Sequence, residues 1–380
     1  MRLLHLSDLH AGKRVRGYSM EEELRSALDQ AVRLCEDRAV DVVLLAGDLY
    51  DNAQSSDRAI DLIGSFLEAL AEKNITVVAT PGNHDSAARV GYGSKLLASR
   101  GVHVTGPLKE PVKPVIVSDE EGPVYIWPIP FVRPATVRAA LDVKTDTYTM
   151  ALKALVDAMG IDTSQRNVCV SHQFVTNGLV SPQRSESELN VGGTDNVDAS
   201  VYEPFDYVAL GHLHRPQKVA RDTVRYAGSP VKYSVSEASN EKSMVLVEMG
   251  SKKDGACETS IELVPIEPVH DLRKIRGPLE ELLSPEVLAS APADDYVYVT
   301  LTDDAMPLDA MGRLREAYPN LMGLELQTEI DAEDELPLMP VEAEASLEAL
   351  FGEFFELQTG HSMSPEQVAV VEASVENLEA

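Results

Sequence analysis

Cysteine is scarce in this sequence, and the few cysteines follow no recognisable pattern. There are three, an odd number, lying far apart with no C-x-x-C pair, at Cys35, Cys169 and Cys257. A disulfide framework and a structural zinc site both require cysteines in paired or closely spaced positions. The sequence therefore argues against both, and isolated cysteines favour a reducing, cytoplasmic location.

Long hydrophobic runs are also missing. Residues 1–10 contain no apolar stretch of signal-peptide length, and no segment approaches the roughly 20 apolar residues that span a membrane. The phosphate-binding pattern G-x-x-x-x-G-K-[ST] does not occur either. We therefore expect a soluble cytoplasmic protein without a membrane segment, in which any dependence on ATP comes from a partner.

Basic residues are few relative to acidic ones. The chain has 33 Lys and Arg against 62 Asp and Glu, a formal net charge of −29, and neither Lys nor Arg follows Arg315. Because nucleic-acid phosphates attract Lys and Arg, this balance counts against tight unassisted binding to DNA. If the chain acts on DNA, we expect a partner to supply the basic surface.

Apolar residues, in contrast, make up 44% of the 380 residues, enough for a large core and for two domains. Over residues 1–110 short apolar runs alternate with helical periodicity, which predicts an α/β layered sheet. The expected strands are 3–6, 42–46, 76–79, 124–129, 168–170 and 207–210, and the expected helices are 21–38, 59–73 and 148–159. Residues 219–247 have the pattern of antiparallel strands, and the polar segment 174–200 that of a functional or mobile loop.

A second unit is expected after residue 267. A strand at 296–301, a helix at 308–317 and a strand at 322–326 predict a small α+β domain over residues 268–330. An acidic, proline-containing linker is expected at 331–345, and a helical tail at 346–380. Residues 1–267 would then form the main domain.

Five polar segments each follow an apolar strand. They are Asp8-Leu9-His10, Gly47-Asp48-Leu49-Tyr50-Asp51, Gly82-Asn83-His84-Asp85, Ser171-His172 and Gly211-His212-Leu213-His214. In open α/β sheets ligands gather at the carboxyl ends of the strands. The chain therefore delivers carboxylate, imidazole and amide groups to one edge of the sheet.

These ligand types indicate a catalytic metal site. Without thiolates, a mixture of carboxylate, imidazole and amide oxygen suits Mn, Fe or Zn. The donors outnumber what one ion needs, and two ions about 3.5–4 Å apart can clamp a phosphate and activate water. D-L-H or G-D-x-x-D alone occurs in many ordinary turns, whereas G-N-H-D and G-H-x-H have little use in packing. Their joint occurrence at strand ends favours a functional site.

In order and spacing, the five segments resemble the calcineurin-like metallophosphoesterase family. The resemblance to the SbcD-type nuclease subunits of that family is closer still, because W-P-I-P-F-V-R-P at 127–134 and Y-A-G-S-P at 226–230 are not general to the superfamily. The resemblance covers roughly residues 1–330 and continues more loosely into the tail. It implies a two-sheet α/β sandwich flanked by helices, with a small α+β capping domain that binds DNA.

The resemblance also implies a role for each residue. One metal ion would be held by Asp8, His10, Asp48 and His214, and the other by Asp48, Asn83, His172 and His212, so that Asp48 bridges. His84 would face the scissile phosphate and Asp85 would orient His84. Asp51 would lie in an outer shell or near the substrate.

The tail carries an apolar stripe at helical spacing. Its members are Leu347, Leu350, Phe351, Phe354 and Phe355. The stripe could pack on its own domain, but the acidic linker before it favours a detached unit that needs another surface. SbcD-like proteins use such a tail to bind an SbcC-like ATPase, and the resemblance implies the same here.

The leading hypothesis is a DNA nuclease subunit in repair, recombination and replication, with two divalent ions, Mn favoured. The resemblance implies ATP-independent single-strand endonuclease activity. With the ATPase it implies 3'–5' double-strand exonuclease activity and hairpin opening, by a homodimer of the nuclease subunit. One alternative is a stand-alone phosphoesterase of a small phosphate ester. The other is a non-catalytic adaptor with the same fold.

Overall fold

The computed structural model describes residues 1–178, 182–185, 195–327, 351–352, 355, 362–365, 367–368 and 370–371. The chain divides into two compact units. The first comprises residues 1–274 and 294–297, and the second comprises residues 275–293 and 298–380.

Two six-stranded sheets form the centre of the first unit. One has the order β16-β15-β1-β4-β5-β6, with bounds Ala256–Pro265, Ser243–Lys253, Arg2–Leu6, Val42–Ala46, Thr76–Thr80 and Val102–Val104. The other has the order β13-β14-β12-β9-β8-β7, with bounds Gln217–Val219, Arg221–Tyr226, Tyr207–Gly211, Arg166–His172, Gly122–Ile129 and Val115–Asp119. Strands β1, β4, β5 and β6 are parallel to one another, as are β8, β9, β12 and β14.

The two sheets pack face to face through side chains that are fully buried. Leu3 and Leu44 from the first sheet belong to the same core as Val124, Val168 and Tyr207 from the second. Strands buried on both faces are expected to be continuously apolar, as Val42–Ala46 is. This sandwich brings together the carboxyl ends of the central parallel strands of both sheets, where the predicted ligand residues lie.

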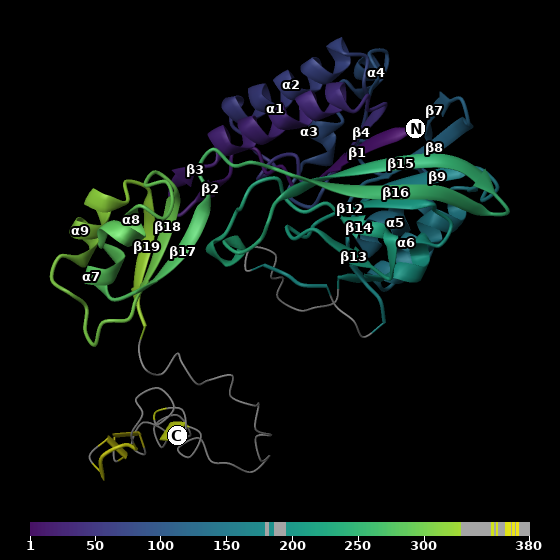
Figure 1. Ribbon diagram of the computed structural model, residues 1–380. Helices are drawn as coiled ribbons and strands as arrows, with labels where there is room; N and C mark the ends of the chain where they lie inside the picture. Colours follow the sequence, from purple (N-terminus) through teal and green to yellow (C-terminus); the bar gives the residue numbers. More distant parts are fainter. Residues whose placement is uncertain are drawn as a thin grey trace. The chain divides into compact units, whose positions relative to one another are not determined.

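Helices cover the outer faces, giving four layers (Figure 1). Helices α1 (Glu21–Asp37) and α2 (Asp57–Glu72) lie against the first sheet, and α5 (Pro134–Leu141) and α6 (Tyr148–Ala158) lie against the second. Ser56 caps α2 by accepting a hydrogen bond from the backbone N–H of Ala59. The short helices α3 (Ala87–Val90) and α4 (Ser94–Ala98) follow β5. The expected α/β sandwich flanked by helices is confirmed.

The sequence located the central strands well but assigned residues 219–247 wrongly. These residues do not form one antiparallel set. Strand β14 is antiparallel to β13 but parallel to β12, while β15 belongs to the other sheet, antiparallel to β1 and β16. In the polar segment 174–200, β10 (Phe174–Thr176) pairs in parallel with β11 (Asn196–Asp198), and the 3-10 helix η2 (Ala199–Tyr202) follows. Residues 179–181 and 186–194 lie outside the described part.

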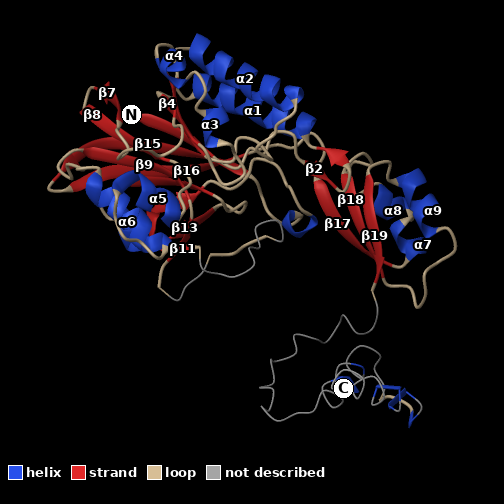
Figure 2. Ribbon diagram, turned by 180° about the vertical axis from the view of Figure 1, so that it is seen from behind, coloured by secondary structure: helices blue, strands red, loops and turns tan. Residues whose placement is uncertain are grey.

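The second unit contains most of a three-stranded sheet of order β17-β18-β19, with bounds Leu272–Gly277, Tyr296–Leu301 and Leu321–Leu326. One face of this sheet carries the helices α7 (Leu279–Leu282), α8 (Pro285–Leu288) and α9 (Ala310–Ala317) (Figures 1 and 2). Leu314 of α9 is fully buried, and the Tyr318 hydroxyl donates to the carbonyl of Leu282 at 2.8 Å. The strands and helix expected at 296–326 are present.

Most of the linker and tail falls outside the described residues, including all of 331–345 and Leu347, Leu350 and Phe354 of the apolar stripe. Of that stripe, Phe351 and Phe355 are described, and Phe351 is 45% exposed. Among the described residues, no helix combines the length and the hydrophobicity that a membrane crossing requires.

Candidate metal centre

Loops at the strand ends of both sheets converge on one buried group of side chains. Asp8 and His10 follow β1, Asp48 follows β4, Asn83 follows β5, His172 ends β9, and His212 and His214 follow β12. The structure thus brings all seven predicted ligand residues together. All except Asn83 are buried.

The backbone of these loops is held in an uncommon conformation. Asp8, His10 and Asp48 have φ angles of 53°, 44° and 50°, in the left-handed region that residues with a side chain rarely adopt. His212 has a φ of 108°. Backbone hydrogen bonds tie the first two loops together, from Asp8 N to the carbonyl of Gly47 at 3.0 Å and from His10 N to that of Asp48 at 2.9 Å. Strained backbone of this kind is concentrated at functional sites.

Glycine is required where the loops approach most closely. A Cβ atom on Gly82 would overlap the carboxylate of Asp48, and one on Gly211 would overlap the carbonyl oxygen of Ala46. The glycines in G-N-H-D and G-H-x-H therefore make room for the neighbouring loop. Both positions explain why these motifs begin with glycine.

One group of donor atoms lies between the β1 and β12 loops. The Nε2 atoms of His10 and His214 are 3.2 Å apart, and His10 Nε2 lies 3.7 Å from Asp48 Oδ2. Ligand atoms of Asp8, His10 and His214 all lie within 4.8 Å of one another. This spacing allows a single cation to contact all three side chains.

A second group lies on the other side of Asp48. The Nε2 atom of His172 is 3.2 Å from Asp48 Oδ2 and 3.0 Å from Asn83 Oδ1. The Nδ1 atom of His212 also lies 3.0 Å from Asn83 Oδ1. The Oδ2 atom of Asp48 therefore lies within reach of both groups.

The ring nitrogens that face away from the centre indicate which nitrogens can bind a metal. His172 Nδ1 lies 2.8 Å from the carbonyl of Ala46, and His214 Nδ1 lies 3.1 Å from Glu237 Oε1. Carbonyl and carboxylate oxygens only accept hydrogen bonds, so each Nδ1 donates and, in the neutral ring, Nε2 keeps a lone pair. In His172 that lone pair faces Asp48 Oδ2 and Asn83 Oδ1, which are themselves acceptors, and in His214 it faces His10 Nε2. A divalent cation satisfies such a set of converging acceptors, so the residues present fit a two-metal site.

Burial determines the protonation of most of these groups. It raises the pKa of Asp8 to about 6, and it lowers the pKa of His212 to about 3 and that of His10 well below its usual value. For Asp48, burial would raise the pKa, but the charges of His172, His10 and His84 and the hydrogen bond with His172 together outweigh burial and lower it. For His172, burial would lower the pKa, but the charges of Asp48 and Asp8 and the hydrogen bonds with Asp48 and the Ala46 carbonyl together outweigh burial and raise it to about 9. Buried carboxylates are costly without a compensating positive charge, which divalent ions would supply.

The expected contact between Asp85 and His84 is absent among the described residues. The Nδ1 atom of His84 lies 2.8 Å from the backbone carbonyl of Asp51, which orients the ring. The Asp85 carboxylate instead accepts backbone N–H groups of Leu49, Tyr50 and Gly82 at 3.0–3.1 Å and 2.9 Å. Within the described part of the chain, Asp85 therefore ties two loops together rather than orienting His84.

The side chain of Asp51 lies at the edge of the centre, 3.6 Å from His10 Nδ1 and 2.8 Å from Lys13 Nζ. Sequence reasoning missed Lys13 and Glu237. Lys13 lies three residues after His10, so its proximity could have been inferred from the first motif. Glu237, in the 3-10 helix η3 (Val235–Glu237), belongs to no motif and is 23 residues from His214.

Comparison with known proteins matches two family models and two curated relatives. Residues 1–216 match the family model described as calcineurin-like phosphoesterase, and residues 268–359 match one described as type 5 capsule protein repressor C-terminal domain. The chain is similar to the SbcD subunit of the nuclease SbcCD from Staphylococcus saprophyticus, with 31% identity over 86% of this chain and 85% of the relative. The corresponding protein of Staphylococcus epidermidis is 29% identical, over 85% of each chain.

Among solved structures, a dimetal phosphatase from Danio rerio aligns over 70% of this chain and 97% of its own, with 12% identity and a TM-score of 0.41. That likeness is too low to support an inference. The sequence relatives and the family model confirm the expected resemblance and a metal-dependent phosphodiesterase. The chain belongs to the calcineurin-like phosphoesterase family and, within it, to the SbcD-type nuclease subunits.

Proposed function

We propose that this chain hydrolyses phosphodiester bonds of DNA as the nuclease subunit of a complex with an SbcC-like ATPase. The observation that carries the proposal is the position of Asp48 Oδ2, 3.7 Å from His10 Nε2 and 3.2 Å from His172 Nε2. One carboxylate within reach of two ligand groups is what a two-ion phosphoesterase requires. By itself the chain would cut single-stranded DNA. With the ATPase it would degrade double strands and open hairpins in repair, recombination and replication.

In this proposal the predicted ligand side chains hold two ions, which share Asp48. Asp8, His10, Asp48 and His214 hold one divalent ion, and Asp48, Asn83, His172 and His212 hold the other. Bound there, the ions would polarise the phosphate and lower the pKa of water so that it attacks phosphorus in line. Manganese is the ion we favour, because oxygen and imidazole donors suit it and no thiolate is present.

His84 acts on the substrate rather than on the ions. Its Nδ1 atom is held by the Asp51 carbonyl, so Nε2 is available to the phosphate. With both ring nitrogens protonated, Nε2 would donate a hydrogen bond to the phosphate and pass its proton to the leaving oxygen. Lys13, paired with Asp51 at 2.8 Å, adds positive charge near the same edge.

The proposed partners are inferred from the net charge of the chain and from the apolar residues of its tail. The net charge of −29 favours a basic partner surface for DNA, and the apolar stripe from Leu347 to Phe355 suits a helix that binds the ATPase. We also propose that the nuclease subunit acts as a homodimer, as the family resemblance implies. Residues 1–267 would be the nuclease domain, 268–330 a DNA-binding cap and 331–345 a linker, all in the cytoplasm.

The test compares two substrates. Manganese-dependent release of nucleotides from a DNA hairpin is measured beside hydrolysis of a generic phosphate diester, with and without the ATPase. We expect both substrates to be cleaved, and hairpin opening to require the ATPase. Cleavage of small esters alone would make the chain a stand-alone phosphoesterase, and cleavage of neither would make it an adaptor.

A further inference from the structure

A buried carboxylate lies directly behind His214, on the side away from the other ligands. Glu237 is 0% exposed, and its Oε1 atom lies 3.1 Å from His214 Nδ1. On the opposite side of the same ring, His214 Nε2 faces His10 Nε2 at 3.2 Å. The imidazole of His214 therefore connects Glu237 to the metal centre.

Lys242 fixes Glu237 in this position. Its Nζ atom lies 2.6 Å from Glu237 Oε2 and also donates to the His214 carbonyl and to Ser229 Oγ, both at 2.8 Å. The backbone N–H of Tyr233 donates to Glu237 Oε2 at 3.3 Å as well. Lys242 thus holds both the carboxylate and the backbone of the histidine that the carboxylate contacts.

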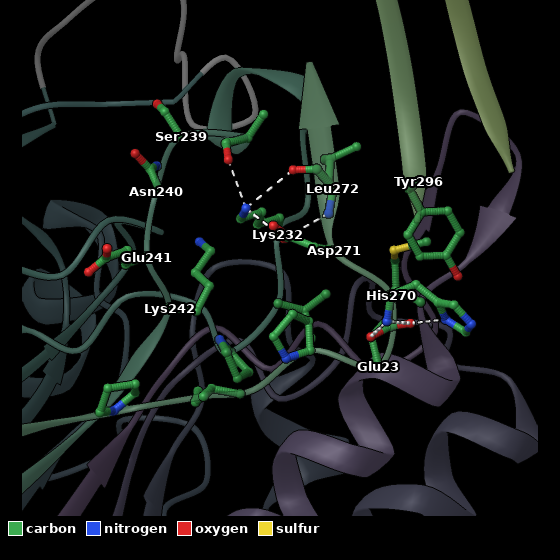
Figure 3. A pocket seen from close by; sticks show the side chains of 17 residues that line it. Glu23, Lys232, Ser239, Asn240, Glu241, Lys242, His270, Asp271, Leu272 and Tyr296 are labelled. Atoms are coloured by element: carbon green, nitrogen blue, oxygen red, sulfur yellow. Dashed lines mark hydrogen bonds and ion pairs between the residues drawn. The ribbon is translucent and has the colours of Figure 1, made fainter. Parts of the chain in front are cut away.

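Lys242 lines a cavity of about 490 Å³ in the first unit together with a second lysine, Lys232 (Figure 3). The two lysines differ in what they hold. Lys232 Nζ lies 2.7 Å from Asp271 Oδ1 and donates to the carbonyls of Ala238 and Leu272. Lys232 is therefore a natural control, because it is also ion-paired in the same cavity wall but pairs with Asp271 instead of Glu237.

We propose that Glu237, held by Lys242, is a positioning residue that fixes the proton of His214 on Nδ1 and so prepares Nε2 to bind a divalent ion. A carboxylate accepts hydrogen bonds but cannot donate them, so this partner selects one tautomer. Its negative charge also increases the basicity of the ring. The inference rests on the proposed function, because it requires an ion at His214.

The contrast with His172 indicates what Glu237 adds. His172 Nδ1 is also oriented by an oxygen, but this is the neutral carbonyl of Ala46 at 2.8 Å. Both histidines would therefore offer Nε2 to an ion. Only His214 would have a buried carboxylate hydrogen-bonded to its Nδ1. Loss of Glu237 should consequently weaken the ion at His214 and leave the ion at His172 in place.

The experiment uses the full chain and three variants, Glu237→Gln, Lys242→Met and the control Lys232→Met. Manganese binding is measured by calorimetry, and melting curves are recorded without metal. Glu237→Gln should weaken one of the two ions roughly 10–100-fold, the range found for outer-shell partners of metal ligands. Lys242→Met should change the same ion in the same direction, and Lys232→Met should change neither.

A structural role alone would give a different result. In such a role, Glu237 serves only to stabilise the fold through its ion pair with Lys242. In that case the Glu237→Gln and Lys242→Met variants melt at lower temperature but bind both ions as the wild type does, and the proposal is wrong. If the wild-type chain binds no ions, it is the proposed function that fails.

A second readout is made on the wild type and does not require the Glu237 or Lys242 variants to fold. Nitrogen NMR of histidine-labelled, metal-free wild type, assigned with His214→Gln, should show the His214 proton on Nδ1. A proton on Nε2 would overturn the positioning role.

Discussion

His10 and His214 present their Nε2 atoms to each other at 3.2 Å in the interior of the first unit, although 204 residues separate them in the chain. The β1 and β12 loops carry these rings. With Nδ1 of His214 donating to Glu237, its Nε2 offers a lone pair, and a metal ion is the partner that accommodates such a pair of nitrogens.

Replacing His84 by Gln should abolish catalysis without removing the ions. We expect activity to fall roughly 10²–10⁴-fold, the usual contribution of a general acid or base. Metal content should stay the same, because the His84 ring is anchored through Nδ1 to the Asp51 carbonyl and its role is toward the phosphate. Metal content and DNA cleavage are measured on one sample, and loss of an ion together with activity would show that His84 is a ligand.

Replacing Asp48 by Asn should weaken both ions together, since Oδ2 lies within reach of His10 and His172. We expect a loss of affinity larger than the roughly 10–100-fold that an outer-shell partner costs. Asp51→Asn is the matched control and should retain both ions, because Asp51 pairs with Lys13 at the edge of the centre. Manganese titration of both variants decides the question, and one normal ion in Asp48→Asn would exclude a bridge.

The ligand residues could be predicted from the sequence because each closely follows a buried apolar strand. Asp48, for example, comes two residues after the fully buried strand Val42–Ala46. The local sequence pattern could not predict which strands, far apart in the chain, would pair with each other. Leu246 of β15 has the same apolar character as Val224 of the preceding strand β14, yet β15 joins the first sheet, where Leu246 pairs with Leu4, whereas β14 belongs to the second. Which strand a segment pairs with is set by long-range packing.

The sequence also could not predict in which direction individual side chains point. The resemblance implied that Asp85 orients His84, but the Asp85 carboxylate accepts backbone N–H groups of the loop after β4. Glu237 could not be found at all, because no motif surrounds it and its partner His214 lies on another segment. Residues that orient ligands carry less sequence signal than the ligands themselves.

His270 should make stability depend on pH. Its Nδ1 atom lies 2.8 Å from Glu23 Oε1, and this hydrogen bond raises the pKa of His270 above 6.5. A raised folded pKa contributes stability below about pH 6.5, and this stability is lost as the pH rises through the folded pKa. The pair is near the surface, so we expect about 1 kcal/mol or less.

The measurement is the difference in melting temperature between wild type and His270→Gln. The difference should be larger at acid pH than at alkaline pH. Glu23→Gln should show little of this dependence. A difference that stays constant across the pH range would contradict the pairing.

Removing the residues after about 335 should leave a folded nuclease that does not join its ATPase partner. All proposed ligands precede residue 215, and the apolar stripe begins at Leu347. Burying that stripe is worth several kcal/mol at about 25 cal/mol per Å². Co-purification with an SbcC-like protein and a melting curve are the measurements. Unfolding of the truncated chain would place the tail in its own core, and retained binding would place the partner contact elsewhere.

The central claim is that two ions share one buried site. Anomalous diffraction from manganese-loaded crystals tests it most directly. We predict two peaks about 3.5–4 Å apart, one near His10 and His214 and the other near Asn83, His172 and His212, with Asp48 between them. A single peak, or two peaks without Asp48 between them, would contradict the account.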